Sequence, residues 1–197
     1  MAYKILVLNL GGTSSKFSIY EDDRHIQTKS VSHSAEEMAA HPLSKDQVAF
    51  RREIVSSFLR ENGYRAADFD TFVLRAPPFR APRGGTYLVE GKCRDVVLSY
   101  YHPDERPIHG NRIVLPLIDE LRGGRDVPVY LVDPDMVDEF SELAHVSGLP
   151  DYARNPSIHY LNQKAIARKY AQDIGKSYSD LRLIICHMGG GISIGAH

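Results

Sequence analysis

The sequence has little excess charge, few cysteines and no long apolar run. Its formal net charge is −1, so nothing suggests nucleic acid or an anionic membrane as a partner. The two cysteines, Cys93 and Cys186, lie far apart and match no zinc or redox spacing, and the histidines are scattered. No apolar stretch reaches membrane-spanning length, and the one near the N-terminus is too short for a signal peptide. We therefore expect a soluble cytoplasmic protein.

The sequence does contain the short apolar segments of a globular protein. Hydrophobic residues make up 43% of the chain and charged residues 25%, which is ordinary for a folded domain. The 197 residues are enough for one domain or for a domain and a fraction. Apolar or alternating runs at residues 5–8, 17–20 and 25–31 predict three strands joined by short turns. The chain should therefore open with an antiparallel meander.

Strand and helix signals alternate after this meander. Short apolar runs predict further strands at residues 71–74, 129–132 and 183–186. Helical spacing predicts helices at about 44–62, at 111–122 with Pro116 as a kink or restart, and at 158–174. Asp133-Pro134 has the form of an N-cap followed by a first-turn proline, which predicts another helix ending at Gly148. The pattern predicts an α/β fold with a mixed β-sheet flanked by helices.

An internal repeat is the most informative feature of the sequence. Residues 5–12 are mirrored by residues 183–190: each is an apolar strand, one polar residue, one apolar residue and a glycine turn, and an alternating strand follows. Glycines at such a turn let backbone N–H groups approach an anion closely. Neither copy is a Walker A loop or a dinucleotide fingerprint. Two ordinary hairpins remain the simpler interpretation, but the repeated order favours a pair of turns that clamp a polyphosphate.

The residues around these turns resemble a known family. Asn9-Leu10-Gly11-Gly12-Thr13-Ser14-Ser15-Lys16 resembles the first phosphate motif of the acetate and butyrate kinases, and residues 187–197 resemble the second in its butyrate-kinase form. Residues 131–139 and 157–165 are also similar to that branch, so the resemblance covers nearly the whole chain in order. It implies a ribonuclease H-like domain of the actin, Hsp70 and acetate kinase type at residues 1–180. Residues 181–197 would then begin a second, truncated domain.

The resemblance also implies roles for individual residues. It assigns catalysis to Arg75, His109, Asp133 and His159, and metal binding to Asn9 and Asp133. It assigns the nucleotide phosphates to Asn9, Gly11, Gly12, Thr13, Ser14, Ser15 and Lys16 in the first turn, and to His187, Gly189, Gly190 and Gly191 in the second. The family pattern around the arginine is Gly-Arg-Gly-Gly, whereas this chain reads Leu74-Arg75-Ala76-Pro77. The glycines that let backbone approach a substrate are therefore missing there.

The implied reaction is reversible transfer of the γ-phosphoryl group of ATP to butyrate or a related short-chain or branched-chain carboxylate. ATP or ADP and Mg²⁺ are the implied cofactors, and a homodimer or a missing second half is the implied partner. Because a carboxylate is already a nucleophile at neutral pH, the site has to align the reactants and neutralise charge. The chain resembles only the first part of such an enzyme, so we expect it to be inactive alone. Acetate or propionate kinase, or a non-catalytic domain that binds an anion or a partner, are the alternatives.

Overall fold

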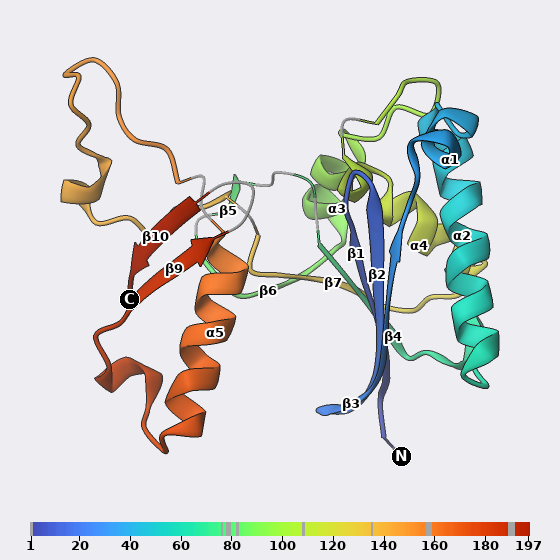
Figure 1. Cartoon of the computed structure of the whole chain (residues 1–197), viewed down its shortest axis with the longest axis horizontal. Helices are drawn as coiled ribbons and strands as arrows, with labels where there is room; N and C mark the ends of the chain where they lie inside the picture. Colours follow the sequence, from blue (N-terminus) through green and yellow to red (C-terminus); the bar gives the residue numbers. More distant parts are fainter. Residues whose placement is uncertain are drawn as a thin grey trace. The chain divides into compact units, whose positions relative to one another are not determined.

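The computed structural model describes residues 2–75, 77, 80–81, 83–107, 109–134, 136–156, 159–188 and 192–197. The chain divides into two compact units (Figure 1). Unit 1 contains residues 1–77 and 86–132, and unit 2 contains residues 78–85 and 133–197. These are units of spatial contact. The domain boundary predicted between residues 180 and 181 marks where a second homologous domain would begin, and it stays a prediction.

Unit 1 is built on a mixed sheet of six strands, as the sequence predicts. In spatial order these are β3 (Arg24–Ser32), β2 (Ser14–Glu21), β1 (Lys4–Leu10), β4 (Thr71–Leu74), β7 (Val129–Val132) and β6 (Thr86–Leu88). The first three form the predicted antiparallel meander, while β1, β4 and β7 run parallel and β6 runs antiparallel to β7. The carboxyl ends of the three parallel strands therefore meet at one edge of the sheet, where an α/β fold commonly places its ligand.

Helices cover one face of this sheet. The helices of unit 1 are α1 (Ala35–Ala40), α2 (Ser44–Glu61), α3 (Gly91–Leu98) and α4 (Val114–Arg122), with 3₁₀ turns at Ala66–Asp68 and Gly110–Arg112. Figure 1 shows α2 and α4 against the sheet, and alternate residues of β1 (Leu6, Leu8 and Leu10) are buried. Pro116 lies in the first turn of α4, where the N–H has no intrahelical acceptor, so it is accommodated there.

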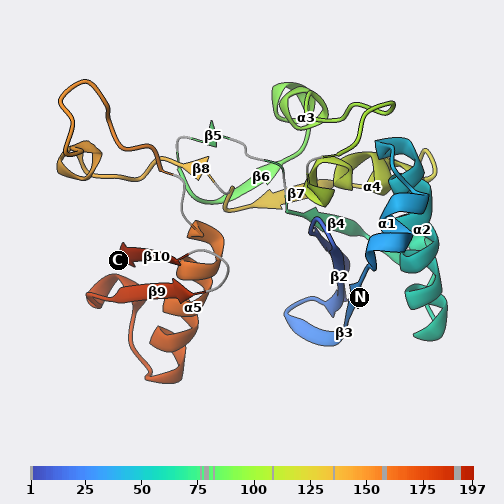
Figure 2. The ribbon, with the colours of Figure 1, turned by 45° about the horizontal axis from the view of Figure 1, so that its top comes forward.

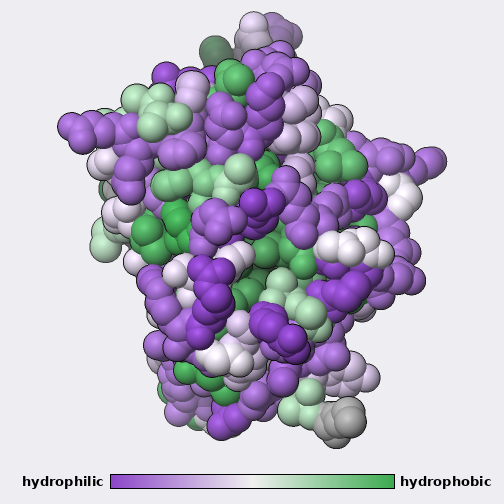
Figure 3. Space-filling view, turned by 90° about the vertical axis from the view of Figure 1, so that its right-hand side faces the viewer, coloured by the Kyte–Doolittle hydropathy of each residue, from purple (hydrophilic) through white to green (hydrophobic). Residues whose placement is uncertain are grey.

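The surface of unit 1 on the side of α1 and α2 is mostly hydrophilic, and apolar side chains show in smaller patches between polar ones (Figure 3). This pattern fits helices that bury one stripe against a sheet and expose the other to water.

Unit 2 combines a helix with a β-hairpin. Helix α5 (Tyr160–Asp173) lies beside the antiparallel strands β9 (Ile184–Met188) and β10 (Ile192–Ala196) in Figures 1 and 2. Strands β5 (Arg80–Ala81) and β8 (Met136–Val137) form a short parallel pair, and 3₁₀ turns occupy Glu142–His145 and Tyr178–Asp180. The outer face of the hairpin leaves Ile184, Met188, Ile192 and Ile194 at least 66% exposed.

The helix predicted from Pro134 to Gly148 is wrong. Asp133 has φ 41°, in the left-handed region, and Met136–Val137 pairs with Arg80–Ala81 as β8. Parallel pairing uses the backbone groups that a helix would need for its own hydrogen bonds. Among the described residues of this stretch, only the short 3₁₀ turn at Glu142–His145 is helical. A local cap signal was therefore overridden by pairing with a distant segment.

Candidate functional site

The first glycine turn joins β1 to β2 at the carboxyl edge of the sheet. Gly11 N–H donates to the carbonyl oxygen of Ser14 at 2.8 Å and closes the turn. Asn9, half-buried near the end of β1, lies opposite Lys16, which is exposed on β2. Among the residues that the structure describes, the N–H groups of Gly12 and Thr13 have no acceptor. The turn therefore presents two backbone donors of the kind that bind phosphate oxygens.

A buried arginine from α2, absent from the predicted site, lies behind this turn. Arg51 is 0% exposed. Its guanidinium donates to the carbonyl oxygens of Gly12 (3.1 Å) and Ser14 (3.0 Å), to the Ser15 hydroxyl (3.0 Å) and to Gln47 Oε1 (3.4 Å). Both Gln47 and Arg51 lie on the buried face of α2, one helical turn apart. Arg51 thus connects the helix layer to the phosphate turn.

A histidine completes the polar cluster behind the turn. His33 is 6% exposed, and its Nε2 lies 2.8 Å from the Ser15 hydroxyl, while its N–H donates to the Thr13 carbonyl at 2.8 Å. Burial, together with the positive charge of Arg51, lowers the pKa of His33 below 6.5. The ring is therefore neutral at neutral pH, and Arg51 carries the positive charge of the cluster.

His109 and Gly110 approach the turn from the loop before α4. The Cβ of any side chain at Gly12 would lie 3.8 Å from Nδ1 of His109, so this candidate catalytic histidine is next to the turn. A cavity of about 390 Å³ opens here, lined by Gly12, Thr13, Met38, Gln47, Arg106, Pro107 and Gly110. Arg106 was absent from the predicted site, and it adds a cation to the pocket that the two unpaired N–H groups adjoin.

Arg75 follows β4 at the same edge of the sheet. Its N–H donates to the carbonyl oxygen of Leu8 on β1 at 3.1 Å, so the residue extends the parallel pairing by one position. The loop after it is only partly described, since Ala76 and Pro78 lie outside the described residues. Within unit 1, the structure therefore brings Asn9, Arg75 and His109 to the carboxyl ends of β1 and β4 and the turn beside them.

Asp133 directly follows β7 and forms hydrogen bonds with the backbone of Gly85 in unit 2. The side chain is 3% exposed. Its Oδ1 accepts the Gly85 N–H at 2.7 Å, and its own N–H donates to the Gly85 carbonyl at 2.8 Å. Nη1 of Arg168 on α5 lies 3.4 Å from Oδ2. These contacts hold the carboxylate of the candidate metal ligand in one orientation.

His159, the other catalytic candidate of unit 2, lies against the second hairpin. Nδ1 of His159 is 2.9 Å from the hydroxyl of Ser193 on β10, which also receives a hydrogen bond from Gln163 at 3.0 Å. The rings of His159 and His187 stack with centroids 3.7 Å apart, and Nδ1 of His187 lies 2.7 Å from Nδ2 of Asn162. The sequence analysis did not identify Gln163 and Ser193 as site residues. The hairpin thus orients His159.

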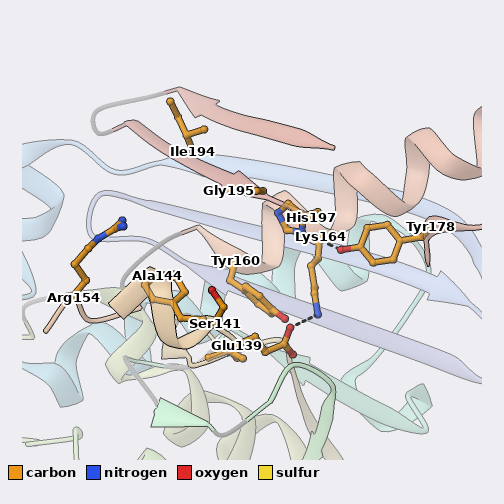
Figure 4. A pocket seen from close by; sticks show the side chains of 13 residues that line it. Glu139, Ser141, Ala144, Arg154, Tyr160, Lys164, Tyr178, Ile194, Gly195 and His197 are labelled. Carbon is orange, nitrogen blue, oxygen red and sulfur yellow. Dashed lines mark hydrogen bonds and ion pairs between the residues drawn. The ribbon is translucent and has the colours of Figure 1, made fainter. Parts of the chain in front are cut away.

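Unit 2 also contains a larger cavity. It measures about 630 Å³, and its lining includes Phe140, Tyr160 and Tyr178 together with Glu139, Lys164 and His197 (Figure 4). Lys164 Nζ lies 2.9 Å from Oε2 of Glu139, and the Gly84 N–H donates to Oε1 at 2.6 Å. Burial raises the pKa of Glu139, but the Tyr160 hydroxyl, Lys164 and this N–H outweigh it and lower the pKa to about 2. Glu139 is therefore a fixed negative charge.

Parts of the predicted site remain predictions. Gly189, Gly190 and Gly191 of the second turn lie outside the described residues. The roles that the resemblance assigns to Asn9, His109, Asp133 and His159 stay predictions. Among the described side chains, no three His, Cys, Asp or Glu residues cluster as metal ligands would. Of the helices that the structure describes, none is long and apolar enough to cross a membrane.

Curated sequence relatives of the chain are named butyrate kinases. Butyrate kinase 1 of Clostridium acetobutylicum is 37% identical over 195 residues, covering 99% of this chain and 54% of that protein. A probable butyrate kinase of Clostridium botulinum (strain Eklund 17B / Type B) is 35% identical over 198 residues, covering 100% of this chain and 54% of that protein. Probable butyrate kinase 1 of Thermotoga maritima is 35% identical, covering 98% and 53%. No protein-family profile matches the chain.

Solved structures support the fold. The Porphyromonas gingivalis acetate kinase has a TM-score of 0.63 at 17% identity, covering 99% of this chain and 55% of that one. A propionate kinase from Francisella tularensis has a TM-score of 0.58 at 16% identity, covering 98% and 54%. The predicted fold class, a mixed sheet with helices of the acetate kinase type, is therefore confirmed. So is the resemblance predicted from the sequence: the chain is a homologue of the butyrate kinases that spans about half the length of the curated relatives it matches.

Proposed function

We propose that this chain forms part of a carboxylate kinase that transfers the γ-phosphoryl group of ATP to butyrate or a related short-chain or branched-chain carboxylate. The products would be an acyl phosphate and ADP, and the reaction would be reversible. The observation that carries the proposal is the match to butyrate kinases at 35–37% identity over nearly the whole chain. The glycine turn with two unpaired N–H groups above a buried arginine supports the phosphate-binding part of it.

The proposed mechanism relies on alignment and charge neutralisation. The substrate carboxylate attacks the γ-phosphorus directly, so the site needs no strong general base. The N–H groups of Gly12 and Thr13 would bind phosphate oxygens of the nucleotide. Arg75 and His109, beside the turn, would face the carboxylate and the transferred phosphoryl group. His159, whose Nδ1 is held by the Ser193 hydroxyl, would donate a hydrogen bond to that group through Nε2.

A magnesium ion is the cofactor expected with ATP, and two residues could hold it. Mg²⁺ usually takes one or two carboxylates together with substrate phosphates and waters, so a cluster of three acidic ligands is not required. Asp133 fits this role because its buried carboxylate is held by Gly85 and each oxygen keeps a further lone pair. Asn9, at the end of β1, would supply a neutral oxygen. When bound, the metal would neutralise charge on the nucleotide phosphates.

The wider context belongs to the same proposal. The substrate would be a small carboxylate, and the protein would act in the cytoplasm. The chain would work with a further polypeptide segment or a second copy, because it spans about half the length of its relatives. We expect no turnover from the 197 residues alone, since the reactants lose most of the benefit of proximity when part of the site is missing.

A fusion protein would test the proposal. Residues 1–197 would replace the matching segment of Clostridium acetobutylicum butyrate kinase 1, and acyl phosphate would be trapped with hydroxylamine while ADP release is followed. We expect Mg-ATP-dependent product with butyrate, and less with acetate or propionate. Circular dichroism and size-exclusion chromatography would establish that the fusion folds, with the unmodified enzyme as control. A folded fusion inactive on every carboxylate would favour a non-catalytic, anion-binding role, whereas a preference for acetate would favour acetate kinase.

A further inference from the structure

The cluster behind the first glycine turn contains a buried charge, and no acidic side chain among the described residues neutralises it. Arg51 is 0% exposed, and among the residues that the structure describes, no Asp or Glu forms an ion pair with it. Its recorded acceptors are neutral: two backbone carbonyls, one hydroxyl and one amide oxygen. Its Nε is buried without an acceptor. The charge persists at neutral pH, because burial lowers the pKa of Arg51 only to about 10.

A buried cation without a counterion is costly, so this one requires an explanation. Fully buried arginines are normally paired with a carboxylate, because the penalty for removing the charge from water is several kcal/mol. An aliphatic residue at this position of α2 would pack beside Val48 and Val55 without that penalty. The guanidinium must therefore serve something that an apolar side chain could not. Its hydrogen bonds indicate that it serves the glycine turn, because three of its four acceptors belong to residues 12–15.

Arg51 also sets the direction of one peptide group in the turn. In a trans peptide the C=O and the following N–H point in opposite directions. The Gly12 carbonyl points toward Arg51 at 3.1 Å, so the Thr13 N–H points away from it. Thr13 is exposed and lines the 390 Å³ cavity. The arginine thus holds the peptide with its donor directed outward, where an anion can reach it.

The opposite side of the turn is supported by a close backbone contact. A Cβ added to Gly110 would lie 2.2 Å from the Gly11 carbonyl oxygen and 2.8 Å from Nη1 of Arg51. The loop before α4 therefore packs directly on the turn and on the guanidinium, and leaves neither room to move. A rigid turn loses little conformational entropy when it binds, which favours the affinity of a pre-formed site.

We infer that Arg51 is a positioning residue for the first glycine turn: it directs the Gly12–Thr13 peptide N–H outward and provides the buried positive charge that a bound phosphate neutralises. This inference rests on the proposed function only where it identifies the phosphate as part of a nucleotide. Inorganic pyrophosphate is the probe, because it has the charge and oxygen geometry of a nucleotide diphosphate without its base. Arg51→Gln removes the charge, and Arg51→Lys keeps the charge but loses the forked donor geometry.

The test is a pyrophosphate titration of the 197-residue chain, followed by NMR through the amide signals of Gly12 and Thr13 and the Nε–H signal of Arg51. We expect all three to shift together in the wild type. Arg51→Gln should weaken binding by roughly 10- to 30-fold, as loss of a charge interaction at close range implies, and Arg51→Lys should fall between. The control is Arg52→Gln. The Arg52 side chain is 43% exposed and paired with Glu53 and Glu120, so binding should change by less than about twofold.

Two results would overturn the inference: a wild-type titration that leaves these signals unmoved, or variants at Arg51 that bind pyrophosphate as the wild type does. The wild-type arm remains decisive even if Arg51→Gln does not fold. The outcome is also separable from the proposed function. If pyrophosphate binding depends on Arg51 but the folded fusion is inactive, the kinase proposal is rejected and this inference stands. If the fusion is active but the Arg51 variants bind pyrophosphate as the wild type does, this inference is rejected and the kinase proposal stands.

Discussion

Gly110 is the position at which a single added methyl group should disturb the candidate site most. The Cβ of Gly110→Ala would lie 2.2 Å from a backbone oxygen of Gly11 and 2.8 Å from the guanidinium of Arg51. Neither neighbour can yield easily, since the oxygen belongs to the turn and Arg51 makes four hydrogen bonds. Overpacking a tight site costs typically about 1–3 kcal/mol, and two constrained contacts favour the upper end. We therefore expect the free energy of unfolding of unit 1 to fall by about 3 kcal/mol.

Amide hydrogen exchange on β1 and β2 would measure this loss, because it reports the stability of unit 1 without requiring both units to unfold together. In a thermal melt the same change should lower Tm by about 6–12 °C. Gly148→Ala is the matched control: its Cβ would meet nothing within 4 Å, so its effect should stay within about 0.5 kcal/mol. A Gly110→Ala protein as stable as the control, with unchanged pyrophosphate affinity, would refute the packing argument.

Three further predictions concern unit 2. The pKa of Glu139 is lowered to about 2 from 4.5, so the stabilisation by its carboxylate is present above pH 4.5 and is lost as the pH falls toward 2. The Tm difference between wild type and Glu139→Gln should therefore shrink over that range, and a constant difference would contradict this prediction. In the active fusion, His159→Ala should lower kcat by roughly 10²–10³-fold, whereas an unchanged kcat would make this histidine structural. Ile184, 79% exposed on the hairpin's outer face, should promote self-association, so Ile184→Lys should reduce it in sedimentation velocity, and equal association would argue for another surface.

The parts of the fold that local sequence encodes were predictable. The strands at residues 5–8, 17–20 and 25–31 follow from apolar runs and alternation, and each lies inside an observed strand. The helix after Pro134 was wrong because the N-cap signal is local, while the pairing of Met136–Val137 with Arg80–Ala81 depends on a segment far along the chain. Helix α3 was missed because it begins at Gly91 with φ 47°, an unusual helix start.

The candidate site was predictable in part for the same reason. Glycine turns repeat visibly in sequence, so the first turn was found. Arg51 was missed because a charged residue in a helix normally belongs to the solvated face. A signal was nevertheless present: Gln47 and Arg51 share a helical stripe with Val48 and Val55, and polar residues within an apolar stripe indicate a buried network. The role of Ser193 could not be read, because its contact with His159 depends on how α5 packs on the hairpin.

Each compact unit is assembled from two separate stretches of chain, and this order has a consequence during synthesis. Gly85 leaves the ribosome well before its partner Asp133, and at roughly 10 residues per second the interval is about 5 s. Meanwhile β1, β2, β3 and α2 are complete and can collapse together, because their contacts are local. A ribosome stalled before Asp133 should therefore expose the backbone around Gly84 and Gly85 to a protease that spares the finished chain, while the meander is already protected.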